Sequence, residues 1–323
     1  MKKYFMFFVL FVAFVTLNSC SSNTGEELIV RTSDVMEDGE STVEALQKYN
    51  SSLLKFSGQT RGSRRLEIAA ADIVGAASGV NAGKTLAGLV GAATGGTGFA
   101  AIVIGAGLIT GASSSYLAYK RHAACSYVED TSRLFDYTKK AVCEKFVMAD
   151  KDALTEGIYE VDDCKDLVAN MIGLPTEFNY IRTLGADHNT ILLAANVEGD
   201  LPSKDEDCNL EQVMLSPEDF SKFNEAMNCR ELKDVFCSSM KKVESESSLD
   251  ALVGCSERVK QALQGYLDLF QSYPENVNDL VEIANGYIKI IEEQNEFSKE
   301  EKELIYSAIM VSVYSPQLWD NYK

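Results

Sequence analysis

Hydrophobic residues along most of the chain recur every three to four positions, which is the spacing of one helix face. The pattern predicts helices within residues 43–54, 158–172, 178–195, 249–273 and 304–311, and one long helix after Pro217. Three helix starts carry residues that bind the first free backbone amides. These are Ser41 with Glu44, Ser216 before Pro217, and Ser298 with Glu301. Strand-like alternation is scarce, so the sequence predicts an all-α fold with loops near residues 199–209 and 273–276.

Small residues occupy every fourth position from Ala71 to Gly95, and the pattern returns in the next apolar stretch. Because residues i and i+4 share a helix face, they form a smooth stripe about six turns long. A second backbone can approach such a stripe closely. We expect a glycine-rich helical hairpin over residues 67–91 and 99–119, with a turn at 92–98. The residues assigned to helix packing are Ala71, Gly75, Gly79, Gly83, Ala87, Gly91, Gly95, Gly107 and Gly111.

This hairpin has two possible environments. Each glycine inside a helix costs about 1 kcal/mol relative to alanine, so close packing or a membrane must compensate. The stretch from Thr85 to Tyr119 holds no charged residue and is long enough to span a bilayer. Basic residues stand on both sides of it, at 61–65 and at 120–121. The sequence leaves open whether the hairpin is buried in the protein's own core or contacts a bilayer or a protein partner.

The N-terminus has the layout of a secretion signal. Lys2 and Lys3 precede an apolar run from Tyr4 to Leu17, which is the length of a signal peptide core and short for a membrane span. Residues 17–20, Leu-Asn-Ser-Cys, resemble the lipobox of bacterial lipoproteins. The resemblance implies cleavage before Cys20 and a lipid on its thiol, so the membrane becomes a partner through that lipid. The alternative is an ordinary secretion signal with a chance cysteine.

The residues after Cys20 bear on the membrane that receives the protein. Ser21 and Ser22 follow it, and the absence of the aspartate that retains lipoproteins at the inner membrane favours the outer membrane. Glu26 and Glu27 are acidic residues of the kind that mark surface export in some bacteria. We therefore expect a lipid-anchored protein of the cell envelope, on the outer rather than the inner membrane, with surface exposure left open.

Charge divides the chain into two parts. The 323 residues, 46% of them hydrophobic, suffice for a sizeable core. Residues 20–122 hold nine basic and nine acidic residues, whereas residues 123–323 hold 19 basic and 39 acidic ones. A strongly acidic domain repels nucleic acid, so we expect no nucleic-acid partner. The predicted parts are a signal peptide (1–19), a lipid-anchored tether with a short helix (20–57), the hairpin (58–122) and an acidic helical domain (123–323).

Cysteines other than Cys20 all lie in the acidic part, as expected of a domain stapled by disulfides outside the cytoplasm. Their number is odd, so at least one thiol stays unpaired. They are Cys125, Cys143, Cys164, Cys208, Cys229, Cys237 and Cys255. Cys229 and Cys237 would stand about 12 Å apart on one helix, which is too far for a bond between them. The absence of a CxxC pair argues against zinc binding and thioredoxin-type chemistry.

Catalytic and metal-binding motifs fail on inspection. The segment from Gly79 to Thr85 is one residue short of a phosphate-binding loop. Asp205, Asp207 and Asn209 alternate like the start of a calcium loop, but Leu210 and Ser216 stand where its glycine and glutamate belong. We therefore expect no catalytic site, cofactor or metal.

His188 lies on an apolar helical face, which predicts a buried, hydrogen-bonded histidine. Together with the lipobox and the zipper-like segment, residues 185–189 and the C-terminal run 312–319 resemble a group of uncharacterised bacterial lipoproteins and secreted proteins. The resemblance implies a structural role for His188, bound to a backbone carbonyl, and for Asn189, as a local cap. It implies no activity and no site residues. We expect a non-enzymatic protein that acts by binding or membrane contact. The alternative is a hydrolase outside the cytoplasm with an unrecognised site.

Overall fold

The computed structural model describes residues 41–54, 63–122, 131–149, 167–195, 211–246, 249, 252, 255–272 and 277–320. All of them belong to one compact unit, residues 32–323. The described residues are mostly helical, which confirms the all-α class. Cys20 and the predicted signal peptide lie outside the described residues.

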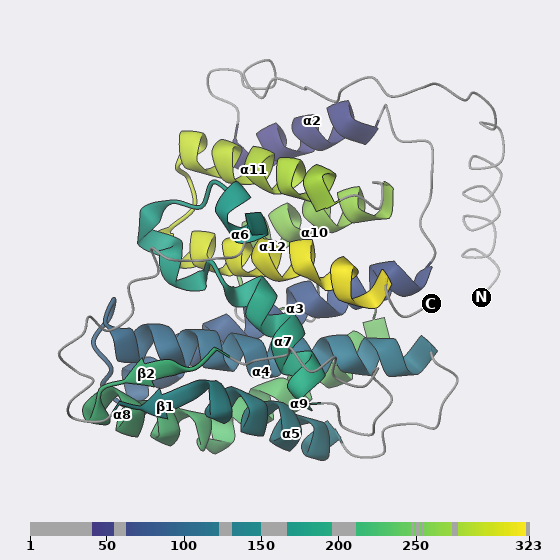
Figure 1. Cartoon of the computed structure of the whole chain (residues 1–323). Coiled ribbons are helices and arrows are strands. Elements are labelled where there is room, and N and C mark those ends of the chain that lie inside the picture. The colour runs from purple at the N-terminus through teal and green to yellow at the C-terminus, as the bar shows by residue number, and fades with distance from the viewer. Residues whose placement is uncertain are drawn as a thin grey trace. The chain divides into compact units, whose positions relative to one another are not determined.

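Helices follow one another along the chain (Figure 1), interrupted by two short strands. The helices are α2 (Thr42–Leu54), α3 (Ser63–Leu89), α4 (Thr97–His122), α5 (Thr131–Lys145), α6 (Leu167–Met171), α7 (Leu184–Ala195), α8 (Pro217–Met227), α9 (Arg230–Glu246), α10 (Glu257–Ser272), α11 (Val277–Gln294) and α12 (Lys299–Asp320). A 3-10 helix, η4 (Thr176–Ile181), precedes α7. The strands β1 (Phe146–Met148) and β2 (Val213–Leu215) pair in parallel, an element that the sequence pattern does not predict.

The three predicted helix starts are confirmed by their capping bonds. The amide of Ser41 donates to the Glu44 carboxylate at 3.0 Å, and the amide of Glu44 donates back to the Ser41 hydroxyl. Ser216 Oγ accepts from the amide of Asp219 at the start of α8. Ser298 and Glu301 make the same reciprocal pair before α12. Each box satisfies amides that the first helical turn leaves without a partner.

Two predicted helices are interrupted. The helix expected over residues 178–195 is broken at Arg182 and Thr183, between η4 and α7. Arg182 donates to the carbonyl oxygens of Ala169, at 3.0 Å, and of two further residues before η4, which holds this turn in place. The long helix expected after Pro217 ends at Met227, and α9 begins at Arg230. Hydrophobic spacing continues across both breaks, so the pattern alone does not reveal them.

The apolar helices α3 and α4 lie side by side (Figure 1) and form the middle of the core. They run antiparallel, because Gly75 faces Thr110 while Gly83 faces Ile102. Around them pack α5, α7, α8, α9, α10 and α12, whereas α2 packs on α10 and α11. By length and composition, α4 is apolar enough over Thr97–Tyr119 to cross a membrane, and 83% of its most apolar window is buried within the protein.

Candidate functional site

Three glycines on α3 face the backbone of α4. A Cβ atom added at Gly75 would stand 2.8 Å from the carbonyl oxygen of Thr110. One added at Gly79 would overlap the Thr110 hydroxyl, and one at Gly83 would stand 2.8 Å from Cα of Val103. The Thr110 hydroxyl also donates to the Gly75 carbonyl oxygen at 2.7 Å. Any side chain at these positions would therefore push the two helices apart.

Four more of the residues assigned to helix packing lie in the buried contact. Ala71 and Ala87 are fully buried on α3. On α4, Gly107 packs against Val80, and Gly111 makes room for Ala76 and the His188 ring.

Gly91 and Gly95 lie after the end of α3, with φ of 69° and 81°, and no atom lies within 4 Å of an added Cβ at either one. Their assignment to helix packing is wrong. They form the turn before α4, where a left-handed backbone conformation favours glycine.

The short helix α7 packs against different helices through its different faces. An added Cβ at Gly185 would collide with the Met310 carbonyl and the Tyr314 ring, so α7 and α12 touch there through backbone. Asp187 accepts a bond from Lys145 of α5 at 2.8 Å. His188 faces α3 and α4. The five-residue run from Gly185 to Asn189 therefore joins the helices that surround it.

Asp72 of α3 and His188 of α7 form a fully buried pair, each with 0% of its surface exposed. Nε2 of His188 lies 3.5 Å from Oδ1 of Asp72, slightly longer than a normal hydrogen bond. Nδ1 of His188 lies 3.1 Å from Oδ1 of Asn189, and Asn189 Nδ2 donates to the Tyr314 carbonyl at 2.9 Å. The predicted backbone-carbonyl partner for His188 and the local cap for Asn189 are therefore both wrong. Both side chains are shielded from solvent.

A second buried carboxylate, Glu303, anchors the start of α12. Lys84 of α3 lies 2.5 Å from its Oε2, and the Tyr180 hydroxyl donates to its Oε1. Burial, and then the neighbouring carboxylate, raise the pKa of Tyr180 far above the usual range for a phenol. The phenol therefore stays protonated and acts as a donor. This cluster stabilises the contact between α3 and α12.

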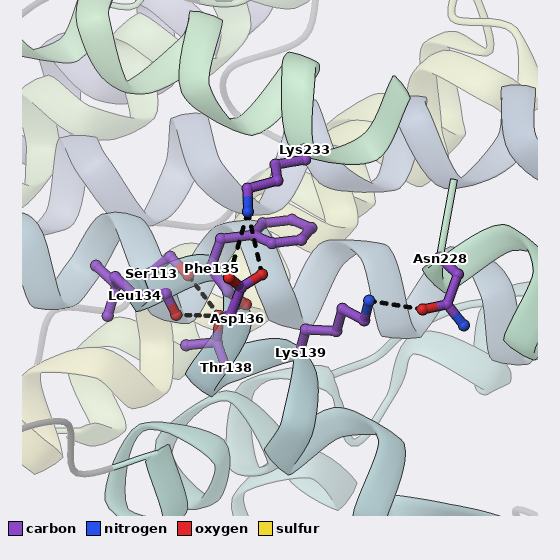
Figure 2. Close-up of polar contacts among 8 residues, drawn as sticks. All are labelled: Ser113, Leu134, Phe135, Asp136, Thr138, Lys139, Asn228 and Lys233. Carbon is purple, nitrogen blue, oxygen red and sulfur yellow. Dashed lines mark hydrogen bonds and ion pairs between the residues drawn. The ribbon is translucent and has the colours of Figure 1, made fainter. Parts of the chain in front are cut away.

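Polar contacts between side chains tie α5 to its neighbours (Figure 2). The hydroxyls of Ser113 and Thr138 meet at 2.7 Å in the buried contact between α4 and α5. Lys233 of α9 binds Asp136 at 3.2 Å and lies 5.6 Å from the centre of the Phe135 ring. Pairs as exposed as Lys233 with Asp136 contribute little to stability, so α5 is held mainly by its buried face.

Part of the disulfide prediction is wrong. No disulfide joins the described cysteines, and Cys143, Cys229 and Cys255 are free thiols. Burial raises the pKa of Cys143 and of Cys255, which makes both less reactive. Cys125, Cys164 and Cys208 lie outside the described residues, as do Asp205, Asp207 and Asn209. Among the residues that the structure describes, no group of three or more His, Cys, Asp or Glu side chains could hold a metal ion.

Sequence reasoning missed Asp72, Lys84 and Glu303. The sequence did hold a signal for Asp72, because it is the only charged residue between Glu67 and Lys84.

No family model, curated protein or solved structure matches this chain. Its function is therefore inferred from its own residues and contacts.

Proposed function

We propose that the protein is a lipid-anchored component of the cell envelope, on the outer membrane, that acts by binding. The observation that carries the proposal is the lipobox at residues 17–20 behind a basic and apolar leader. Several acyl chains on Cys20 would hold the protein firmly, since each buried CH₂ adds about 0.8 kcal/mol. The 21 residues from Cys20 to Glu40 reach at most about 75 Å when extended, so α2 can stand well clear of the bilayer.

The contacts of α3 and α4 support an anchor made of lipid alone. The glycine stripe of α3 packs against α4, and six further described helices cover the two. This packing supplies the compensation that the interior glycines need, without a membrane. We propose that the hairpin is a structural core rather than a membrane insert, and that it builds the helical domain that does the binding.

The turn between α3 and α4 is the surface that we assign to contact with a bilayer or a protein partner. Leu89 is 68% exposed, more than the exposed methionines Met148 and Met214. The segment from Gly88 to Thr97, which contains this turn and the adjoining helix ends, holds no charge. Burying this exposed leucine beside uncharged small residues would remove apolar surface from water without removing a charge from water. Any disulfides of this domain would involve cysteines other than Cys143, Cys229 and Cys255. The binding role does not require them.

The lipid anchor is tested by Cys20→Ser in the native host. Labelled palmitate should be incorporated into the wild-type protein and not into the variant, which should leave the outer-membrane fraction. Cys143→Ser is the matched control, because Cys143 is a half-buried thiol and its loss should change neither result. Undiminished labelling of the Cys20→Ser protein would refute the anchor.

A further inference from the structure

Hydrogen bonds around the buried Asp72 and His188 pair fix the number of protons that it holds. The two side chains meet at 3.5 Å, and neither Asp72 oxygen accepts a hydrogen bond from any described residue. Asp72 comes from α3 and His188 from α7, so the pair joins two helices of the core. Since α7 packs mainly on α4, α5 and α12, the pair is its polar link to α3 among the described residues.

Asn189 sets the position of one proton. Its amide nitrogen donates to the Tyr314 carbonyl at 2.9 Å, and a carbonyl oxygen only accepts. The amide of Asn189 cannot be reversed without opposing two oxygen atoms. Its oxygen therefore faces Nδ1 of His188, at 3.1 Å. Since that oxygen also only accepts, Nδ1 must carry a hydrogen.

The second nitrogen then meets a carboxylate. A neutral imidazole has one hydrogen, so with Nδ1 protonated its Nε2 carries a bare lone pair. An ionised Asp72 would direct its negative charge at that lone pair in a fully buried place. A buried carboxylate without a donor is strongly unfavourable. One added proton removes the conflict, either on Nε2 as an ion pair or on Asp72 as a neutral hydrogen bond.

We propose that Asp72 and His188 share one proton in the folded protein, and that this proton fastens α7 to α3. The proton belongs to the pair rather than to either residue. Its loss at alkaline pH leaves an uncompensated carboxylate inside the core and loosens the contact between the two side chains. The pair thus makes the stability of the protein sensitive to pH above neutrality.

Other ionisable groups lie on the same helices and on helices packed against them, among them Tyr116 of α4, Lys145 of α5, Tyr314 of α12, Glu67 of α3 and Asp187 of α7. Lys145 is held by Asp187 and by the Glu211 carbonyl. None of these groups donates to the Asp72 carboxylate.

The direction of the pH effect follows from proton counting. In an unfolded chain a histidine loses its proton near pH 6.5 and an aspartate near pH 3.9, each value being about that of a free side chain. Between these values both states hold one proton on the two residues, so the pair adds no pH dependence. Above about pH 6.5 only the folded state keeps it. The unfolding equilibrium constant should then rise up to about tenfold per pH unit, until the folded protein also releases the proton.

Nuclear magnetic resonance of the imidazole nitrogens tests the proton directly. The full chain in detergent has two histidines, so a His122→Gln variant assigns the signals of His188. At pH 7.5 we expect a hydrogen on Nδ1 and a second one shared between Nε2 and Asp72. A His188 with Nδ1 bare, or with Nε2 bare beside an ionised Asp72, would overturn the proposal.

Asp72→Asn tests the consequence. Its amide nitrogen can donate to Nε2 of a neutral His188, so the bond survives without the extra proton. Urea unfolding between pH 6.5 and 8.5 should therefore lose the wild-type dependence on pH. Asp136→Asn, at an exposed site, is the control and should keep it. An unchanged dependence in Asp72→Asn would overturn the proposal, and if that variant does not fold, the nitrogen signals of the wild type decide.

Discussion

Single polar residues in this core are oriented by partners that lie far away in the sequence. Asn50 of α2 donates to the Gly265 carbonyl at 2.8 Å and accepts from the Tyr287 hydroxyl, 237 residues away, at 2.8 Å. Burial raises the pKa of Tyr287 well above the usual range, so the phenol stays protonated and remains a donor. One asparagine thus connects α2 to both α10 and α11.

Tyr287→Phe removes the donor and leaves the Asn50 oxygen buried without a partner. We expect the free energy of unfolding to fall by about 1–3 kcal/mol, the cost of one unsatisfied buried group. Urea denaturation measures it. Tyr137→Phe is the control at a site that is 39% exposed, and it should change stability by less than about 0.5 kcal/mol. Equal effects of the two substitutions would contradict this reading of Asn50.

The contacts that could be predicted at this scale are the local ones. Ser41 with Glu44 and Ser298 with Glu301 are three residues apart, so helical geometry alone brings them together. The apolar spacing around His188 predicted a buried histidine, and the side chain is fully buried. Its partner Asp72 could not be predicted, because no local rule relates α3 to α7. The contact depends on how the helices pack.

At the scale of elements, the period of four small residues indicates the face of α3 that meets α4 but not where the helix ends. Gly91 and Gly95 continue the period and yet lie in the turn, since nothing in the spacing marks the left-handed conformation there. Gly105 lies outside the pattern, and its lack of a side chain lets Phe223 and Met227 of α8 pack close to α4. The strands β1 and β2 escaped prediction because three residues are too few for alternation to be recognised.

Two glycines of α3 should respond in opposite directions to added bulk. Gly79→Leu would push against Thr110 and the Ala106 carbonyl, and we expect a loss of about 1–3 kcal/mol or more. Gly88 has no atom within 4 Å of an added Cβ, so Gly88→Ala should stabilise the helix by about 0.5–1 kcal/mol. Urea midpoints of both variants measure the difference. A Gly79→Leu protein as stable as the wild type would show that close packing of α3 on α4 is unnecessary.

At the scale of the whole molecule, buried charge pairs act against a large acidic excess. The chain carries a formal net charge of −18, which repels itself in the folded state. Lys84 offsets this where α12 begins, by neutralising the buried Glu303. The contact joins α3, the middle of the core, to the last described helix. Neither residue stood out in the sequence, because charged residues at helix ends are usually solvent-exposed.

Lys84→Met leaves the Glu303 carboxylate buried with Tyr180 as its remaining described partner. Breaking a buried pair from one side costs roughly 3 kcal/mol, and chemical denaturation should show it. Lys140→Met removes the exposed partner of Glu144 and should cost less than about 1 kcal/mol. If Glu303→Leu added to Lys84→Met restores part of the loss, the cost lies in the unpaired carboxylate. A double variant no better than Lys84→Met would place the cost elsewhere.

The position of α2 has a consequence for the order in which the chain folds. The amide of Thr42 bonds to Glu296, 254 residues further along, and Asn50 bonds to Tyr287. Contacts of such high sequence separation form slowly, because a long loop must close before they stabilise anything. Synthesis produces α2 well before α10 and α11, the helices on which α2 packs. The still later α12 covers α3, so until it is made α3 lacks part of its cover and the chain is most exposed to aggregation.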